Sequence, residues 1–510
     1  MGNMARRRLI GPTAALVAVA MFGLVACQPR PRPTRIVAVA TVLRSSSDRS
    51  FELARSFVAV RRANRSVETS SAALRLDPTS RFQTMEGFGA AITGSTAYNL
   101  LSMPARERHR FLVETFSVRR GLGYSYVRVP IGASDFSLSE YTLDDTPGIE
   151  NFALQYEERE LLIPVLREIL RINPHLKVMG SPWTAPPWMK VSDVTSRNPH
   201  PHYAAGYLDP ARYQDYATYF VKWIEAFQAN GVPIESITMQ NEPLNPWNSV
   251  SMLMPWDQQQ AFVRDALGPA LAAAGLHTKV YAFDHNFNYD GWPSQDDYPI
   301  RVYSDPAAAR FLTGAAYHDY GGTSEELLDI HAKAPDKGLL FTESSLGLWN
   351  DGRNLAARLV PDAIHFGTEM STRWNQGVIV WNLMLDANGG PNRPGGCRTC
   401  FGAVDLGTDG HTITRNSHYI VIGHLASVVR PGAVRIGTTG SAGEGIDSVA
   451  FVNRDHSRAV LLVNSTSTDR STVLLDGNRR LDVVVPARGV LSVRWPGPRH
   501  SFETTPTTRN

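Results

Sequence analysis

Two glutamates of this sequence stand in surroundings that suit the cleavage of a glycosidic bond. Glu242 lies in the run Gln-Asn-Glu-Pro at 240–243, and Glu343 lies in Phe-Thr-Glu-Ser at 341–344. Cleavage through an oxocarbenium-like transition state needs one protonated carboxyl group to assist the leaving group and a second carboxylate on the opposite face of the sugar. Glu242 and Glu343 offer such a pair, although they lie far apart in the chain.

The distance between the two carboxyl groups decides the stereochemistry of the reaction. A separation of about 5 to 5.5 Å would make one glutamate a nucleophile and retain the configuration of the sugar. We expect a like-charged neighbour and partial burial to raise the pKa of the acid, so that it carries a proton near neutral pH. Asn241, beside Glu242, is placed to hydrogen-bond the 2-hydroxyl group of the sugar.

From Phe88 onward, short apolar runs alternate with longer amphipathic stretches, which is typical of repeated βα units. The stretch 213–230, for example, has apolar residues at helical spacing and is followed by Gly231. Eight strands are the number that a barrel needs, and no glycine-rich nucleotide turn follows the first run, which disfavours an open doubly wound sheet. The sequence therefore predicts an α/β fold, a (β/α)8 TIM barrel with strands at 88–93, 126–131, 177–182, 236–240, 280–284, 315–320, 339–342 and 378–383.

Polar and aromatic residues follow these strands at their carboxyl ends, where barrel enzymes hold their catalytic groups. Taken singly, each has a structural alternative: Glu343 as a buried carboxylate paired with Arg128, His318 as a core histidine, each tryptophan as a core or rim aromatic. Their joint position favours a sugar site, because hydroxyl groups need polar partners and the C–H faces of a sugar stack on aromatic rings. The residues are Arg128, Asp135, Trp183, Asn241, Glu242, His318, Tyr320, Glu343, Trp381 and Asn382.

The segments that flank the barrel are rich in short β-type runs. Before it, 36–43 and 72–76 are predicted strands with a helical piece at 51–60, and after Val429 five further runs predict an antiparallel β-sandwich side domain. We divide the chain into a lipoprotein-type signal peptide (1–27), a Pro/Arg-rich tether (28–35), the N-terminal part of the sandwich (36–84), the catalytic barrel (85–428), the C-terminal part of the sandwich (429–497) and a disordered tail (498–510).

The N-terminus has the pattern of an export signal. Three arginines at 6–8 precede an apolar run from Leu9 to Ala26, as in a secretory signal peptide. The run ends Leu-Val-Ala-Cys, which resembles the lipobox of bacterial lipoproteins and makes Cys27 the expected site of lipidation. An ordinary signal peptide with a chance cysteine is the alternative, and both Sec and twin-arginine export stay open. We expect an extracellular or cell-envelope protein that touches a membrane only through this anchor.

Charge and cysteine content narrow the range of partners. The 51 basic and 48 acidic residues give a net charge of +3 without long runs, so nothing points to nucleic acid. Cys397 and Cys400 have C-x-x-C spacing, but no second Cys/His pair completes a zinc site. In an exported chain this spacing favours a local disulfide, with two thiols of no catalytic importance as the alternative.

Several motifs, in order along the chain, resemble glycoside hydrolase family 30, which includes lysosomal glucocerebrosidase and microbial endo-β-1,6-glucanases. The most specific is Ser-Pro-Trp-Thr-Ala-Pro-Pro-Trp-Met-Lys at 181–190, and the resemblance extends from about Ser71 to Gly432. The other motifs that carry it are 86–91, 128–131, 134–137, 240–243, 342–343, 381–382 and 389–392.

The resemblance implies a (β/α)8 barrel with a side β-sandwich built from both chain ends, retaining hydrolysis of β-glucosides, and no metal or organic cofactor. Glu242 would be the general acid and base, and Glu343 the nucleophile. The residues implied to bind the sugar at the cleavage point are Asp135, Trp183, Asn241, Tyr320, Trp381 and, as a further addition, Asn392. His318 joins this set from its position at a strand end.

Two positions depart from the glucocerebrosidase type. Thr93-Gly94-Ser95 stands where that type has Thr-Asp, and Asp319 stands where it has Trp, while the Gly-rich loop 395–400 is more similar to the β-1,6-glucanase branch. We therefore expect β-1,6-glucan as the substrate, with a glucosylceramidase-type β-glucosidase or a glucan transglycosylase as alternatives. A non-catalytic carbohydrate-binding lipoprotein would lack one carboxylate, and both are present. The sequence leaves the oligomeric state open.

Overall fold

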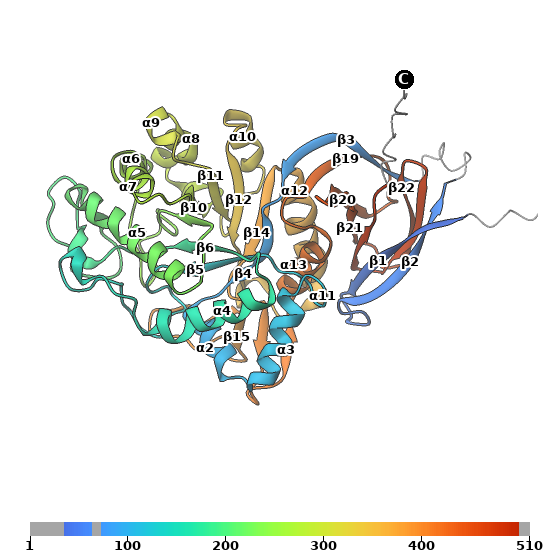
Figure 1. Cartoon of the computed structure of the whole chain (residues 1–510), viewed down its shortest axis with the longest axis horizontal. Helices are drawn as coiled ribbons and strands as arrows, with labels where there is room; N and C mark the ends of the chain where they lie inside the picture. Colours follow the sequence, from blue (N-terminus) through green and yellow to red (C-terminus); the bar gives the residue numbers. More distant parts are fainter. Residues whose placement is uncertain (1–34, 64–72, 499–510) are drawn as a thin grey trace, which may run out of the picture.

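The computed structural model describes residues 35–63 and 73–498 and consists of a (β/α)8 barrel with a β-rich side domain (Figure 1). The predicted signal peptide, Cys27, most of the tether and most of the tail lie outside the described residues. Within the described residues, no helix combines the length and the apolar character needed to span a bilayer.

Eight parallel strands close the barrel in the order β10-β11-β12-β14-β4-β5-β6-β9, which confirms the predicted fold and all eight predicted strands. Their inward side chains form a separate core cluster in which residues such as Tyr126, Met179 and Tyr281 fill the barrel. The strands are β4 (Gly87–Ala91), β5 (Tyr126–Pro130), β6 (Lys177–Ser181), β9 (Ser236–Thr238), β10 (Lys279–Asn286), β11 (Gly314–His318), β12 (Gly338–Glu343) and β14 (Asn375–Val380).

Helices cover the outside of the barrel. The longest, α5 (Tyr213–Ala229), packs its buried aromatic face on the strands. A β-carbon at Gly180 on β6 would lie 2.4 Å from the Trp223 ring, so only glycine lets this helix approach so closely. The others are α2 (Gly94–Ser102), α3 (Ala105–Phe116), α4 (Ile163–Ile172), α6 (Trp256–Phe262), α7 (Gly268–Ala273), α8 (Tyr298–Tyr303), α9 (Pro306–Ala309), α10 (Glu326–Lys333), α11 (Leu355–Asp362), α12 (Met370–Thr372) and α13 (Ser417–Val428).

The side domain is a sheet of nine strands that closes on itself around its own apolar core, and both ends of the chain contribute to it. All neighbouring strands are antiparallel except β3 and β22, which are parallel. The strands are β1 (Ile36–Ser46), β2 (Ala54–Arg62), β3 (Leu74–Thr84), β19 (Val434–Gly440), β20 (Ile446–Val452), β21 (Arg458–Asn464), β22 (Arg470–Asp476), β23 (Arg479–Val485) and β24 (Gly489–Trp495).

The helical piece expected at 51–60 was wrong, because most of it belongs to strand β2. β2 pairs with β1 in antiparallel register, from Arg44 opposite Ala54 to Ile36 opposite Arg61. So short a segment has no decisive period of its own, and the hydrogen bonds offered by β1 decide its conformation.

Short sheets brace the loops around the carboxyl ends of the barrel strands. β13 (Leu346–Gly347), just after Glu343, pairs with β16 (Cys400–Phe401), and β15 (Met384–Asp386) pairs with β17 (Val404–Leu406), which pairs with β18 (Ile413–Arg415). β7 (Lys190–Val191) pairs with β8 (Tyr207–Leu208). The loops that follow several strands are therefore tied to each other.

A buried histidine joins the barrel to the side domain. His424 on α13 lies 3.0 Å from the Ser492 hydroxyl through Nδ1 and 3.0 Å from the Ser45 hydroxyl through Nε2. Burial lowers the pKa of His424 from 6.5 to about 3, so the ring is neutral where it meets β1 and β24.

This histidine predicts a pH dependence of stability. Between pH 6.5 and about pH 3, His424 is protonated in the unfolded chain but neutral in the folded protein. The contribution of His424 to the free energy of unfolding is therefore complete above pH 6.5 and is lost as the pH falls. His424→Gln should reduce the slope of the free energy of unfolding against pH, between these limits, by up to about 1.4 kcal/mol per unit. Denaturant unfolding at several pH values measures the slope. The exposed control His277→Gln should keep the wild-type slope, and an unchanged slope in His424→Gln would contradict the prediction.

Candidate active site

The barrel brings Glu242 and Glu343 together at the carboxyl ends of its strands. Glu343 is the last residue of β12, and Glu242 follows β9 with a backbone φ of 45°, in the left-handed region that side chains rarely adopt. One carboxylate oxygen of each glutamate and a ring nitrogen of His318 all lie within 4.8 Å of one another. This spacing is close to the separation of about 5 to 5.5 Å at which one carboxylate acts as nucleophile.

Arg128 on β5 anchors the Glu343 carboxylate. Its guanidinium is fully buried and donates to Glu343 Oε2 at 2.7 Å, to Asp284 Oδ2 at 2.8 Å and to Asn241 Oδ1 at 2.7 Å. The structural alternative for Glu343, a pair with Arg128, is therefore present as part of the site. Tyr320 donates its hydroxyl to the other oxygen of Glu343 at 3.0 Å.

Asp284 is a functional residue that the sequence analysis missed. Its fully buried carboxylate accepts hydrogen bonds from five side chains, and its pKa is lowered well below the usual range because Arg128 and His318 outweigh the effect of burial. Phe283 and Asp284 have φ of 70° and 79° where the β10–β11 register shifts, which turns the carboxylate into the barrel. The donors are Arg128, Ser181, Thr238, His318 and Thr342. Asp284 ends a predicted strand, so inspection of every strand end would have found it.

The surroundings of Glu242 correct one expectation. Burial acts to raise the pKa of Glu242, but hydrogen bonding and charge from His318, with a further contribution from His285, outweigh it and lower the pKa to about 2. His318 Nδ1 lies 3.5 Å from Glu242 Oε1, and the amides of Asn245 and Asn248 donate to Oε2 at 2.8 and 2.5 Å. The expected rise from the like-charged Glu343 was wrong, because the cation and the donors lie closer.

His318 and Glu343 complete the electrostatic arrangement. Burial acts to lower the pKa of His318, but the surrounding carboxylates of Glu343, Asp284 and Glu242 raise it to about 10. Burial raises the pKa of Glu343, although His318 and Arg128 act in the opposite direction. The His318–Glu242 pair therefore holds one proton, located on the imidazole when the site holds no substrate.

A cavity of about 290 Å³ opens above the two glutamates. The rings of Trp183 and Trp381 stack with centroids 5.2 Å apart and form part of its wall, and Tyr320 and Asp135 also line it. Burial and the carboxylates of Glu343 and Glu242 raise the pKa of Asp135 to about 8. Adjacent indole rings can contact the C–H faces of a sugar, and polar side chains on several sides can hydrogen-bond its hydroxyl groups, so the cavity suits a sugar ring.

The loop that follows β15 closes one side of this cavity. Cys397 and Cys400, which form a disulfide, line the cavity. Arg393, also missed from sequence, donates to Glu140 Oε1 at 3.0 Å, to the carbonyl of Ser134 at 2.9 Å, and to the carbonyl of Ser249. It thus ties together the loops after β5, β9 and β15.

The predicted site residues divide into three groups. Trp183, Tyr320, Trp381 and Asp135 line the cavity with the two glutamates, and Asn241 and His318 lie buried beneath them. Asn392 is turned into its own loop, where its amide donates to the carbonyls of Gly389 and Cys397, so its expected contact with the sugar is not supported by its position. Asn245, Asn248 and Trp349 line the cavity without having been predicted, because they lie in loops whose path the sequence pattern does not fix.

Glu242, His318 and Glu343 are also close enough to be considered as metal ligands. The guanidinium of Arg128 already binds Glu343, and His318 carries a raised pKa, so two positive groups occupy the positions where a cation would be stabilised. This donor set does not favour a metal ion. The other such group among the described residues, Asp297, Glu326 and Asp329, is partly exposed and lies outside the cavity.

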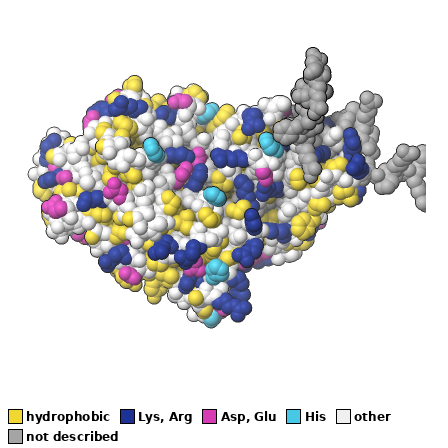
Figure 2. Space-filling view, viewed as in Figure 1, with side chains coloured by type: hydrophobic (Ala, Val, Ile, Leu, Met, Phe, Trp, Pro, Cys, Tyr) yellow, Lys and Arg dark blue, Asp and Glu magenta, His cyan; other side chains and the backbone are white. Residues whose placement is uncertain are grey.

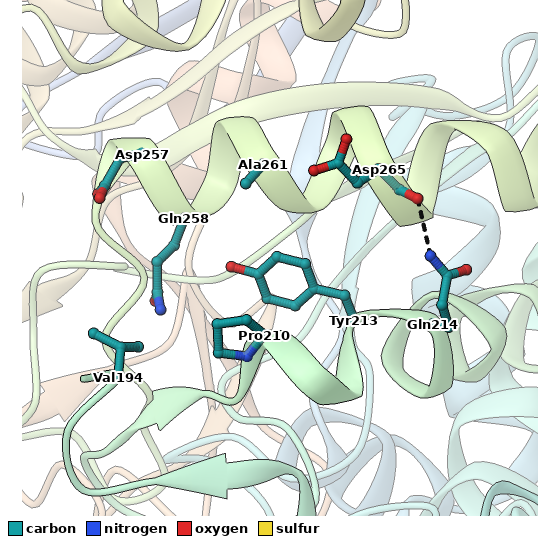
Figure 3. Close-up of a pocket in the computed structure, with 8 residues that line it drawn as sticks. All are labelled: Val194, Pro210, Tyr213, Gln214, Asp257, Gln258, Ala261 and Asp265. Atoms are coloured by element: carbon teal, nitrogen blue, oxygen red, sulfur yellow. Dashed lines mark hydrogen bonds between the residues drawn. The ribbon is translucent and has the colours of Figure 1, made fainter. Parts of the chain in front are cut away.

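A second hollow, of about 500 Å³, lies on the outer helical layer between α5 and α6 (Figure 3). Tyr213 lies in its middle, with Asp257 and Asp265 on the helix opposite. The amide of Gln214 donates to the Asp265 carbonyl at 2.9 Å and links the two sides. Among the described residues that line it, the two carboxylates, Asp257 and Asp265, lie about two helical turns apart, so the reacting groups belong to the cavity at the strand ends.

Comparison with known proteins agrees with this geometry. The family model described as "Glycosyl hydrolase family 30 TIM-barrel domain" matches residues 85–399, and "Glycosyl hydrolase family 30 beta sandwich domain" matches 432–493. An endo-1,6-beta-D-glucanase of Neurospora crassa is 31% identical over 446 residues, which are 82% of this chain and 87% of that protein. The lysosomal acid glucosylceramidase of Mus musculus is 26% identical over 490 residues, 91% of this chain and 90% of that protein.

Solved structures give the same result. The endo-beta1,6-glucanase BT3312 is 53% identical, with a TM-score of 0.87 over 90% of this chain and 100% of that one. SrfJ from Salmonella typhimurium is 27% identical, with a TM-score of 0.78 and the same coverage. The chain belongs to glycosyl hydrolase family 30.

Proposed function

We propose that this hydrolase cuts internal linkages of β-1,6-glucan. The observation that carries the proposal is the pair of glutamate oxygens within 4.8 Å of each other, in a cavity whose wall includes two stacked tryptophans and in a chain that is 53% identical to an endo-beta1,6-glucanase of solved structure. Two further relatives, from Neurospora crassa and Aspergillus fumigatus, are also named as endo-1,6-beta-D-glucanases.

In the first step the Glu343 carboxylate attacks the anomeric carbon, and the bond to the leaving glycosidic oxygen breaks. Arg128 and Tyr320 hold the two oxygens of Glu343, so the nucleophile is oriented before the substrate arrives. The proton that the pair holds on His318 passes to Glu242, 3.5 Å away, and Glu242 delivers it to the departing oxygen, which leaves Glu242 as a carboxylate.

In the second step Glu242, now a carboxylate, takes a proton from water, and the resulting hydroxide attacks the anomeric carbon from the side that the leaving group has vacated. The bond to Glu343 breaks, and two inversions restore the β configuration. Asn241 has its oxygen fixed by Arg128, which leaves its NH2 group to donate to the sugar 2-hydroxyl.

The glucosylceramidase alternative rests on relatives such as the mouse enzyme, but one contact favours the glucan. Asp319, which occupies a position where the glucocerebrosidase type has Trp, turns its carboxylate to His365 at 3.0 Å. This chain therefore has a carboxylate paired with a histidine, and not an indole, at that position. Transglycosylation uses the same intermediate, with a sugar hydroxyl in place of water.

The N-terminal pattern also indicates where the enzyme acts. We propose that the enzyme is exported and lipidated on Cys27, with the Pro/Arg-rich segment as a spacer. Expression in a bacterial host should give a membrane-bound mature protein that begins at Cys27, detected by mass spectrometry of the N-terminal peptide. Cys27→Ser should release the protein from the membrane fraction, and wild-type protein that stays soluble after signal cleavage would contradict lipidation.

The substrate and the nucleophile can be tested together. Purified enzyme should release oligosaccharides from β-1,6-glucan and act far less on β-1,3-glucan and glucosylceramide, and Glu343→Gln should lower the rate by about 10⁴-fold or more. Chromatography of the products measures both. Greater activity on glucosylceramide would overturn the glucan assignment, whereas activity that survives in Glu343→Gln would overturn the role of Glu343.

The shared proton of His318 and Glu242 predicts a shift in the pH profile. In the wild type the proton leaves the pair with the raised pKa of His318, about 10, whereas in His318→Asn it rests on Glu242 alone, whose ordinary value is 4.5. The alkaline limb of kcat/KM should therefore move to lower pH by at least about one unit. The remote control His331→Asn, on α10, should keep the wild-type limb, and an unchanged limb in His318→Asn would exclude the shared proton.

A further inference from the structure

A hollow lined by four arginines lies where the barrel meets the side domain. Its volume is about 170 Å³, and Arg55, Arg119, Arg430 and Arg494 contribute to its wall. Among the described residues that line it there is no carboxylate. Figure 2 shows Lys and Arg side chains gathered on the visible face near the junction of the two domains.

This arginine pocket lies at the opposite end of the barrel from Glu242 and Glu343. Part of its wall is the turn that leads from α3 into the start of β5, and α13 ends beside it. The amino ends of barrel strands form the face away from the catalytic end. A ligand bound here would not compete with the glucan.

The guanidinium groups of the pocket are poorly compensated. Arg55 donates to the carbonyl of Gly121 at 3.1 Å, and Arg430 donates to the carbonyls of Ala426 and Val118 at 2.8 and 3.1 Å. Of the four arginines, only Arg494 forms an ion pair within the described residues, and its partner is the largely exposed Asp455. The Nε of Arg430 is buried and has no hydrogen-bond partner in the part of the chain described.

The neighbouring hollow is a useful comparison, because its lysines have carboxylate partners. It shares Val118 and Arg430 with the arginine pocket and measures about 700 Å³. Its two lysines, Lys177 and Lys279, are both paired with Glu86 and Glu235. The two lysines of this hollow therefore have carboxylate partners, whereas no carboxylate is among the described residues that line the arginine pocket.

Burial and the neighbouring arginines both disfavour the charged form of Arg430. Burial, followed by the positive charges of Arg494 and Arg55, lowers the pKa of Arg430 to about 10. An anion placed among the three side chains would offset this repulsion. Arginine is suited to this role because its planar fork of N–H donors matches the oxygens of phosphate and sulfate.

We propose that the arginine pocket binds a phosphate or sulfate group, either as the free ion or as the monoester end of a larger molecule. Water occupies about 30 Å³ per molecule in the liquid, so a hollow of 170 Å³ takes a small oxyanion in place of a few waters. Arg119 is exposed at the rim, where it can reach an anion without a change in the packing of the two domains.

Thermal unfolding and calorimetric titration of the full chain with inorganic phosphate test the proposal, with sodium chloride used to hold the ionic strength constant. The Tm should rise with phosphate and then saturate. Arg119→Gln and Arg430→Gln should each weaken phosphate binding by at least about tenfold, since each removes charged hydrogen bonds. The control Arg480→Gln changes the same charge on the exposed face of β23, beside Asp482, and should bind phosphate as the wild type does.

Arg430 hydrogen-bonds the backbone of the turn and of α13, so Arg430→Gln could fail to fold. Arg119 is exposed at the rim, so Arg119→Gln keeps the experiment decisive in that case. Phosphate stabilises most folded proteins through exclusion from the surface, but that effect does not saturate and is equal in all variants. Such a result, or an unchanged affinity in Arg119→Gln, would overturn the proposal. Glucose 6-phosphate distinguishes the two sources: binding within tenfold of inorganic phosphate supports a monoester end, and selective binding of inorganic phosphate supports the free ion.

Discussion

The buried guanidinium of Arg128 connects the strands that carry the chemistry. Its partners are Glu343 at the end of β12, Asp284 on β10 and Asn241 after β9. An arginine in this position without its carboxylate partners would be a buried unpaired charge, which costs about 3 to 5 kcal/mol. Arg128 therefore links the ends of these strands and orients the Glu343 carboxylate, whereas Glu242 is held by other partners.

The charges around Arg128 also decide where the proton lies. Burial alone would leave every carboxylate of the site partly protonated, but Arg128 and His318 keep Asp284 ionised and move the proton of the acid onto the imidazole. The neighbours of Glu242, and not its own burial, therefore determine the direction of its pKa shift. Burial raises the pKa of Asp135, and the carboxylates of Glu343 and Glu242 raise it further.

The two domains meet through groups that have no part in catalysis. His424 bridges hydroxyl groups of β1 and β24 as a neutral ring, whereas the arginines nearby meet as uncompensated charges. At the other end of the barrel, Arg393 and the disulfide loop join the segments that wall the sugar cavity. The loops around the sugar cavity are therefore cross-connected at one end of the barrel, and the junction with the side domain at the other end is electropositive.

The sequence by itself determined the barrel, because eight apolar runs with polar ends are a local pattern. It also singled out Glu242 and Glu343, which the barrel brings together, because their motifs are local as well. It failed at β2, where pairing with β1 overrides a weak local preference. The tertiary structure alone decided the position of Asn392, the bracing by Arg393 and the pKa of Glu242. These depend on which charges and carbonyls lie within a few ångströms, and distant segments supply them only when the barrel closes.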